Sequence, residues 1–178
     1  MGIEVVQSDE YGSFVCSSSV REALEENDVE KAANYLGHYY TLVGDVVHGE
    51  QLGGTIGYPT LNIRPKNECQ LLPAIGSYAA FCEVNGKRYQ AMVAVTRRPT
   101  TGNHENVVVE AHLFDYTGNL YGQQVTLYFD RFLRFERKFS SLKELQRQLK
   151  EDERIAREIL SGTHDAFATK GIWKRLFK

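Results

Sequence analysis

The pattern of apolar and polar positions divides the 178-residue chain into three zones, of which the first is helical. Over residues 17–36, apolar side chains recur at helical spacing in two short stretches that meet at Glu26-Asn27-Asp28 and end at Gly37. The spacing of a capping box occurs twice, at Ser19 with Glu22 and at Asn27 with Glu30. We therefore expect two short helices at the start of the chain.

The second zone, from about Tyr39 to Phe132, is rich in β-branched and aromatic residues and predicts strands. Asn85-Gly86 is a strong hairpin signal, because both positions of that turn need a positive φ. Thr117-Gly118-Asn119 predicts a second turn. The expected strands cover residues 39–48, 77–84, 88–95, 106–116 and 123–129. Short strands with no helices between them indicate an antiparallel barrel or sandwich.

The last zone returns to helix, with a capping box at Ser141 and Glu144 and a stop at Ser161-Gly162. Its apolar face comprises Leu142, Leu145, Leu149, Ile155, Ala156, Ile159 and Leu160. The tail, residues 163–178, carries several large apolar side chains. It either docks on this chain or folds onto a partner, and the pattern does not decide between the two.

Composition narrows the class of protein. The 21 Lys and Arg against 23 Asp and Glu leave a formal net charge of −2, which argues against a protein built to grip a nucleic acid backbone. No apolar run is long enough to span a bilayer, and we expect no membrane partner. Cys16, Cys69 and Cys82 form no C-x-x-C pair and are expected to be free thiols in the cytoplasm.

A glycine-rich segment is the most informative part of the chain. Gly49, Gly53, Gly54 and Gly57 lie within nine residues, so the backbone there can approach a ligand closely and offer N–H groups to an anion. No Gly-Lys-Ser/Thr follows, which excludes a Walker A loop. Thr60 and Asn62 alternate onto one face of an extended strand, where their oxygens suit Mg²⁺ carried with a nucleotide. A glycine-rich turn before a strand is the alternative.

Two other features admit more than one interpretation. Glu110 lies within an apolar strand, so its carboxylate faces either a polar site or solvent. His112 lies on the same strand face and is expected to be a hydrogen-bonded barrel histidine. Arg131–Phe139 interleaves cations with aromatic rings, a pattern that also suits stacking on single-stranded nucleic acid, although the near-neutral charge argues against that.

These residues carry a resemblance to a known family. Gly53-Gly54-Thr55-Ile56-Gly57-Tyr58-Pro59-Thr60-Leu61-Asn62 resembles the signature of riboflavin kinases, in particular the kinase module at the C-terminal end of bacterial bifunctional FAD synthetases. Further matching segments follow in the family order: residues 71–78, 98–100, 110–116, 120–122, 133–139 and 148–152. The resemblance implies a mainly β fold, an antiparallel Greek-key barrel of about six strands with a C-terminal helix and two short N-terminal helices.

The resemblance also implies a reaction, the ATP- and Mg²⁺-dependent phosphorylation of the riboflavin 5′-hydroxyl to give FMN and ADP. By position, Glu110 matches the general base, and Thr60 and Asn62 match the residues that hold Mg²⁺ and the ATP phosphates. The loop that closes over the phosphates corresponds to Gly49, Gly53 and Gly57. The flavin ring is expected to lie against Tyr58, Arg134 and Phe139.

The start of the chain resembles a different module. Ser17-Ser18-Ser19-Val20-Arg21 is similar to an element near the end of the FMN adenylyltransferase domain of the bifunctional enzymes. We therefore expect residues 1–36 to be a helical remnant of that domain, 37–162 to form the kinase barrel with its helix, and 163–178 to be a tail. An upstream adenylyltransferase domain is the expected partner, and this chain alone is not expected to transfer adenylyl groups.

Four positions depart from the family pattern. Gly54 stands where Arg or Lys is usual, Ala94 and Thr96 stand where Asn and Gly are usual, and Asn119 replaces Asp. None of these removes Thr60, Asn62 or Glu110. They motivate an alternative, a catalytically weak or inactive barrel that binds flavin or nucleotide in a regulatory or docking role.

Overall fold

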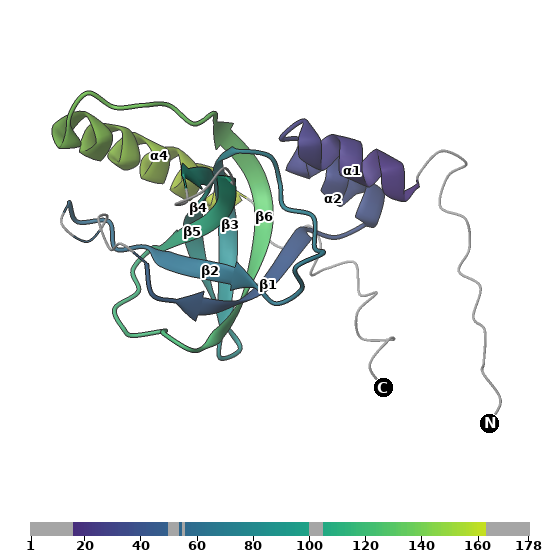
Figure 1. The fold of residues 1–178 in the computed structure, drawn as a ribbon, viewed down its shortest axis with the longest axis horizontal. Helices are drawn as coiled ribbons and strands as arrows, with labels where there is room; N and C mark the ends of the chain where they lie inside the picture. Colours follow the sequence, from purple (N-terminus) through teal and green to yellow (C-terminus); the bar gives the residue numbers. More distant parts are fainter. Residues whose placement is uncertain (1–15, 50–53, 55, 100–104, 163–178) are drawn as a thin grey trace.

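The computed structural model describes residues 16–49, 54, 56–99 and 105–162, and shows a β-barrel flanked by helices on two sides (Figure 1). The six strands are β1 (Tyr40–Val47), β2 (Leu61–Pro65), β3 (Gly76–Val84), β4 (Lys87–Pro99), β5 (Glu105–Leu113) and β6 (Gln124–Arg134). They close in the order β1-β2-β5-β4-β3-β6, and every neighbouring pair is antiparallel. The predicted six-stranded antiparallel barrel is therefore confirmed.

The turns explain where the strands end. Asn85 and Gly86, with φ of 51° and 74°, form the predicted hairpin between β3 and β4. The strand expected to reach Tyr116 stops at Leu113, because Asp115 has a φ of 57° that no strand accommodates. β6 runs five residues beyond the predicted end at Phe129, and its pairing with β3 absorbs two register irregularities around Tyr78 and Ala79.

Two short helices precede the barrel, as predicted: α1 (Ser17–Glu25) and α2 (Val29–Leu36), the latter closed by Gly37 with a φ of 74°. The predicted capping boxes are wrong. α1 begins two residues before Ser19, so Cys16 occupies the N-cap without a side-chain cap bond. Asn27 has a φ of 63° in the link, and Asp28 caps α2 instead by accepting from the Lys31 N–H at 2.9 Å.

Both N-terminal helices pack on the barrel. Ala23, Leu24, Val29 and Ala32 belong to the same buried cluster as the inward-facing residues of the strands. Polar contacts fix this packing, because the Tyr78 hydroxyl donates to Asn27 Oδ1 at 2.8 Å and the Ala74 N–H donates to the Leu24 carbonyl at 3.0 Å. The fold therefore buries one continuous core through the barrel and the helices.

The C-terminal helix, α4 (Leu142–Gly162), lies across the outer face of the barrel on the opposite side from α1 and α2 (Figure 1). Its start is as predicted, since the Glu144 N–H lies 3.2 Å from Ser141 Oγ. Ala156 and Leu160 are buried against Ala79, Met92 and Phe114 of the barrel wall. The predicted tail at 163–178 lies outside the described residues.

Candidate functional site

A cavity of about 370 Å³ lies between α4 and the outward-facing residues of the barrel. Its lining includes the polar residues Thr60, Arg98, Glu110 and His112, the ion-paired Arg134 and Asp152, and apolar residues of α4. The remaining lining residues are Ile56, Tyr58, Gly76, Ser77, Met92, Val93, Ala94, Thr96, Glu136, Arg137, Phe139, Leu142, Leu145 and Leu149. A cavity that combines polar and apolar walls suits a substrate that is itself partly polar and partly apolar.

The strand register brings three of the relevant positions into one row. Asn62 of β2 pairs with Glu110 of β5, which pairs in turn with Ala94 of β4. The adjacent row, Leu61, Ala111 and Val93, includes two fully buried residues of the barrel core. Because successive residues of a strand point to opposite faces, the row that contains Glu110 faces outward, beneath α4.

Asn62 is buried beside the start of the glycine-rich loop. Its side chain is 6% exposed and lies against the backbone of Gly49 so closely that a Cβ on Gly49 would come within 1.9 Å of Asn62 Nδ2. Thr60 directly precedes β2 and lines the cavity, whereas Asn62 is not among the lining residues. The structure thus brings Thr60, Asn62 and Gly49 together around the strand start.

Glu110 faces the cavity and carries an ion pair there. Arg98 Nη2 lies 2.7 Å from Glu110 Oε1, and the two side chains are 29% and 20% exposed. A carboxylate on an apolar strand needs such compensation, since burying an unpaired charge is costly. Of the two sequence interpretations, the polar site is the observed one. Arg98 lies in the family-matching segment 98–100, but no local pattern indicates its pairing with Glu110 twelve residues away.

A second ion pair lines the same cavity. Arg134 at the end of β6 bonds to both carboxylate oxygens of Asp152, with Nε at 3.0 and 2.9 Å and Nη2 at 2.7 Å. Gln148 Nε2 also donates to Asp152 Oδ1 at 2.7 Å. The Arg134 guanidinium carbon lies 5.7 Å from the centre of the Phe139 ring. The family resemblance implies a flavin site at Arg134 and Phe139, whereas the ion pair with Asp152, 18 residues from Arg134, is a tertiary contact that the sequence pattern does not show.

Tyr58 lines the cavity and contacts His112 on the outer face of β5. Its ring meets that of His112 edge-on, with centroids 5.2 Å apart, and burial followed by the nearby Glu153 carboxylate raises its pKa. The Nδ1–H of His112 donates to the Pro59 carbonyl at 2.8 Å, since a carbonyl only accepts. His112 is therefore the hydrogen-bonded histidine that the sequence predicted.

In its described part, the glycine-rich loop contacts α4 through Ile56. Gln146 Nε2 donates to the Ile56 carbonyl at 3.1 Å, and Gly57 follows with a φ of 84°. Such a φ favours glycine, which accounts for the residue at this position. Gly53, also predicted to bind phosphate, lies outside the described residues.

The described residues hold no group of three His, Cys, Asp or Glu side chains placed to bind a metal ion. A divalent cation here would need oxygens from a nucleotide together with the Thr60 hydroxyl or the Asn62 amide, which are hard donors suited to Mg²⁺.

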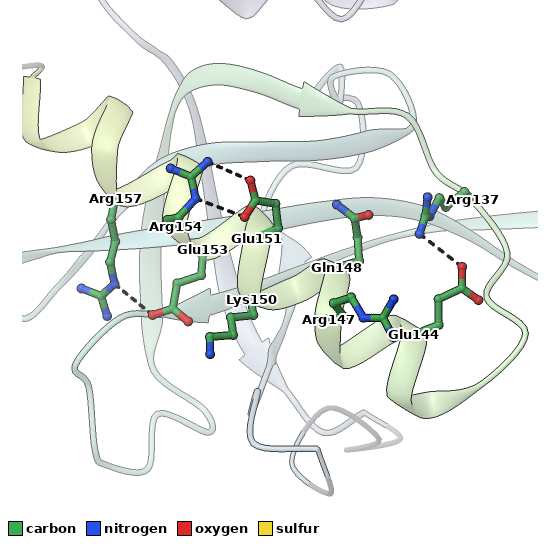
Figure 2. A pocket seen from close by; sticks show the side chains of 9 residues that line it. All are labelled: Arg137, Glu144, Arg147, Gln148, Lys150, Glu151, Glu153, Arg154 and Arg157. Carbon is green, nitrogen blue, oxygen red and sulfur yellow. Dashed lines mark hydrogen bonds and ion pairs between the residues drawn. The ribbon is translucent and has the colours of Figure 1, made fainter.

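The solvent-facing side of α4 is a different kind of surface. Figure 2 shows a hollow lined by Arg137, Glu144, Arg147, Gln148, Lys150, Glu151, Glu153, Arg154 and Arg157. Most of these charges are matched along the helix, for example Arg154 with Glu151 at 2.8 Å and Arg157 with Glu153 at 2.9 Å. Their exposure makes this a solvated ion-pair network. The candidate site is therefore the cavity on the barrel side of α4.

The fold is a closed six-stranded antiparallel barrel with a polar cavity covered by a helix, and comparison with known proteins identifies the family. The riboflavin kinase family model matches residues 36–160. This chain therefore belongs to the riboflavin kinase family.

Relatives and solved structures agree with that assignment. The chain is 34% identical over 151 residues to the bifunctional riboflavin kinase/FMN adenylyltransferase of Listeria monocytogenes (85% of this chain, 48% of that protein). It is 37% identical over 144 residues to the Bacillus subtilis enzyme of the same name (80% and 45%). The chain thus spans about half the length of the curated relatives it matches.

Two crystal structures share the fold. The riboflavin kinase of Trypanosoma brucei aligns with a TM-score of 0.51 at 25% identity, covering 71% of this chain and 82% of that one. A Streptococcus pneumoniae protein described as a macrolide-efflux protein aligns with a TM-score of 0.77 at 35% identity, covering 84% of this chain and 48% of that one. Within the described part of this chain, no helix has the length and apolar character needed to cross a membrane.

Proposed function

We propose that this chain transfers the γ-phosphoryl group of ATP to the 5′-hydroxyl of riboflavin, giving FMN and ADP. The observation that carries the proposal is that one cavity is lined by Thr60 and Glu110 together with Arg134 and Phe139. Family membership supports the same reaction. The lining of this cavity includes residues of β3, β4, β5, β6, α4 and the segment that precedes β2.

The nucleotide is proposed to bind at the start of β2. Gly49, Gly53 and Gly57 would place backbone N–H groups around the phosphates, and Thr60 and Asn62 would hold Mg²⁺ together with them. Bound there, Mg²⁺ neutralises charge on the phosphates during transfer. The close packing of Asn62 on Gly49 supports a site in which loop and strand act together.

The flavin is proposed to occupy the part of the cavity that α4 covers. An isoalloxazine ring needs flat apolar walls and few polar anchors, and Tyr58, Phe139 and the leucines of α4 provide such walls. Asp152 holds the guanidinium of Arg134 in one orientation. The N–H groups of Arg134 that do not bond to Asp152 therefore point in fixed directions.

Glu110 is proposed to be the general base. The 5′-oxygen forms a bond to the γ-phosphorus while the bond to the β–γ bridging oxygen breaks, and that electron pair leaves with ADP. The hydroxyl proton passes to the Glu110 carboxylate and then to solvent. Alignment and proton acceptance are the contributions that phosphoryl transfer requires from protein side chains.

The test is FMN formation from riboflavin, ATP and Mg²⁺, followed by chromatography. We expect Glu110→Gln to lower kcat by about a hundredfold or more. The fluorescence of riboflavin should still be quenched when it binds to this variant. Glu25→Gln, on the exposed face of α1, is the matched control and should retain full activity. Absence of FMN with the wild-type chain, under conditions where another riboflavin kinase is active, would refute the proposal.

The second candidate function is a barrel that binds flavin or nucleotide without turnover. The observation in its favour is that Glu110 is engaged by Arg98. Saturable quenching of riboflavin or FMN fluorescence with no product would support this candidate over the kinase. The assignment of residues 1–36 to an adenylyltransferase remnant stays a prediction, and we propose an upstream adenylyltransferase domain as the partner of this module because the matched relatives are named for both activities.

A further inference from the structure

The ion pair between Arg98 and Glu110 spans an unusual distance along the sheet. Glu110 pairs with Ala94 of β4, so Arg98 lies four residues farther along the strand, roughly 13 Å away at the usual strand rise. Contact at 2.7 Å between Arg98 Nη2 and Glu110 Oε1 therefore requires both side chains to extend toward one another. A general surface contact would not need this alignment.

The sequence between the two charges permits the approach. Ala94, Thr96 and Arg98 alternate onto the outward face of β4, and the pair formed by Thr96 and Val108 lies between Arg98 and Glu110. Neither Ala94 nor Thr96 is large enough to fill the space above the strands, and both line the cavity. The Arg98 side chain thus extends along the cavity wall toward the carboxylate.

The two carboxylate oxygens of Glu110 differ in their contacts. In the described part of the chain, the side-chain partner of Glu110 is Arg98, whose Nη2 contacts Oε1 of the carboxylate. The second oxygen, Oε2, carries no recorded hydrogen bond in that part of the chain. A carboxylate held by one oxygen keeps the other in a defined direction, whereas an unheld carboxylate rotates freely about its terminal bond.

We propose that Arg98 is the positioning residue for Glu110, holding Oε1 so that Oε2 accepts the proton of the substrate hydroxyl. This inference rests on the proposed function, because it assigns a role within the same reaction. Arg98 itself does not touch the reacting atoms in this account, and its effect on the rate passes entirely through Glu110.

A double-mutant cycle tests the proposal. We expect Arg98→Met, which keeps an unbranched apolar stem and removes the charge, to lower kcat about thirtyfold, within the range for lost alignment of a general base. The KM values for riboflavin and ATP should stay within about threefold of wild type. In a Glu110→Gln background the same substitution should change the rate by less than about threefold, because no base remains to be positioned.

Two further variants keep the experiment decisive. Arg98→Lys retains the charge and should recover part of kcat, and it supplies the cycle if Arg98→Met fails to fold. Arg97→Met changes the neighbouring, exposed arginine, which does not line the cavity, and should leave kcat unchanged. FMN is measured with enzyme in excess over several hours, so that the slow Glu110→Gln rates are resolved.

Each result has one meaning. An equal loss of kcat from Arg98→Met in both backgrounds overturns the proposal, since Arg98 would then act independently of Glu110. A raised KM for ATP with kcat retained also overturns it and makes Arg98 a nucleotide ligand. Either result leaves the kinase function standing when the wild-type chain forms FMN, whereas an inactive wild type refutes both.

Discussion

Gly49 illustrates how a single residue can set the geometry of the site. It lies where β1 leads into the glycine-rich loop, and the space its Cβ would occupy is filled by the buried side chain of Asn62. Any larger residue would force Asn62 to rotate or the loop to move. The close packing of the loop on the strand therefore requires glycine at position 49, because glycine has no Cβ.

We expect Gly49→Ala to raise the KM for ATP about tenfold, because the displaced Asn62 no longer lies at the proposed phosphate site. Steady-state kinetics against ATP at saturating riboflavin measure this. Gly54→Ala is the matched control in the same loop, since nothing lies within 4 Å of the position its Cβ would take. Equal kinetics for the two variants would contradict a special role for Gly49.

The cysteines differ in reactivity for reasons that are also local. At the start of α1, hydrogen bonds from the Ser19 side chain and from the Ser19 and Ser18 backbone lower the pKa of the Cys16 thiol to about 7. Burial raises the pKa of the Cys82 thiol to about 12. The first thiol is exposed and the second is fully buried.

We expect iodoacetamide to alkylate Cys16 readily at pH 7 and to leave Cys82 unmodified until the chain unfolds. Because the thiolate reacts and its fraction falls below the pKa, the Cys16 rate should drop about fivefold between pH 7 and pH 6. Peptide mass spectrometry resolves the two sites. Modification of Cys82 in the folded protein at a rate similar to Cys16 would show that the barrel core is open.

At the scale of elements, α4 is positioned by the charges at its centre. Asp152, 3% exposed, bonds to Arg134 of β6 and to Gln148 one turn earlier in the helix. This network joins the helix to the strand end where the proposed flavin site lies. A buried carboxylate with three donors is stable only while all of them remain in place.

We expect Asp152→Ala to lower the free energy of unfolding by about 3 kcal/mol, because it leaves the Arg134 charge partly buried and unpaired. Riboflavin affinity should fall with it, since Arg134 is then free to leave the cavity wall. Urea denaturation and fluorescence quenching measure the two effects. Glu151→Ala removes the neighbouring, exposed ion pair to Arg154 and should change neither quantity measurably.

At the scale of the whole molecule, the N-terminal helices belong to the barrel's core. Leu24 is 1% exposed within the cluster that contains the inward-facing strand residues, and Asn27 accepts from the buried Tyr78 of β3. Packing of this kind couples the stability of helices and barrel, whatever domain their sequence resembles.

We expect Leu24→Ala to lower the free energy of unfolding by about 3 kcal/mol in a single transition. Far-ultraviolet circular dichroism, dominated by the helices, and near-ultraviolet signals from the barrel tyrosines should shift together. Glu25→Ala, on the exposed face of the same helix, should leave both unchanged. Loss of helical signal with an unchanged barrel transition would show that α1 and α2 fold separately.

Local chemistry explains what could be predicted from the residues alone. Asn85-Gly86 predicts its hairpin because few residues tolerate two successive positive φ angles, and Ser141 with Glu144 predicts the start of α4 because both groups act within one turn. The capping box at Ser19 failed because α1 begins at Ser17 and that spacing falls inside the helix, and the one at Asn27 failed because the next residue, Asp28, caps α2.

The sequence by itself determined the succession of helices and strands, the glycine-rich loop with Thr60 and Asn62 beyond it, and the resemblance that family membership confirmed. Each of these depends on neighbours within a few positions of the chain. Tertiary structure decided the contacts across long separations: Arg98 with Glu110, Arg134 with Asp152, and Asn27 with Tyr78. Those pairs depend on strand register and helix docking, which are fixed by burial of the whole core.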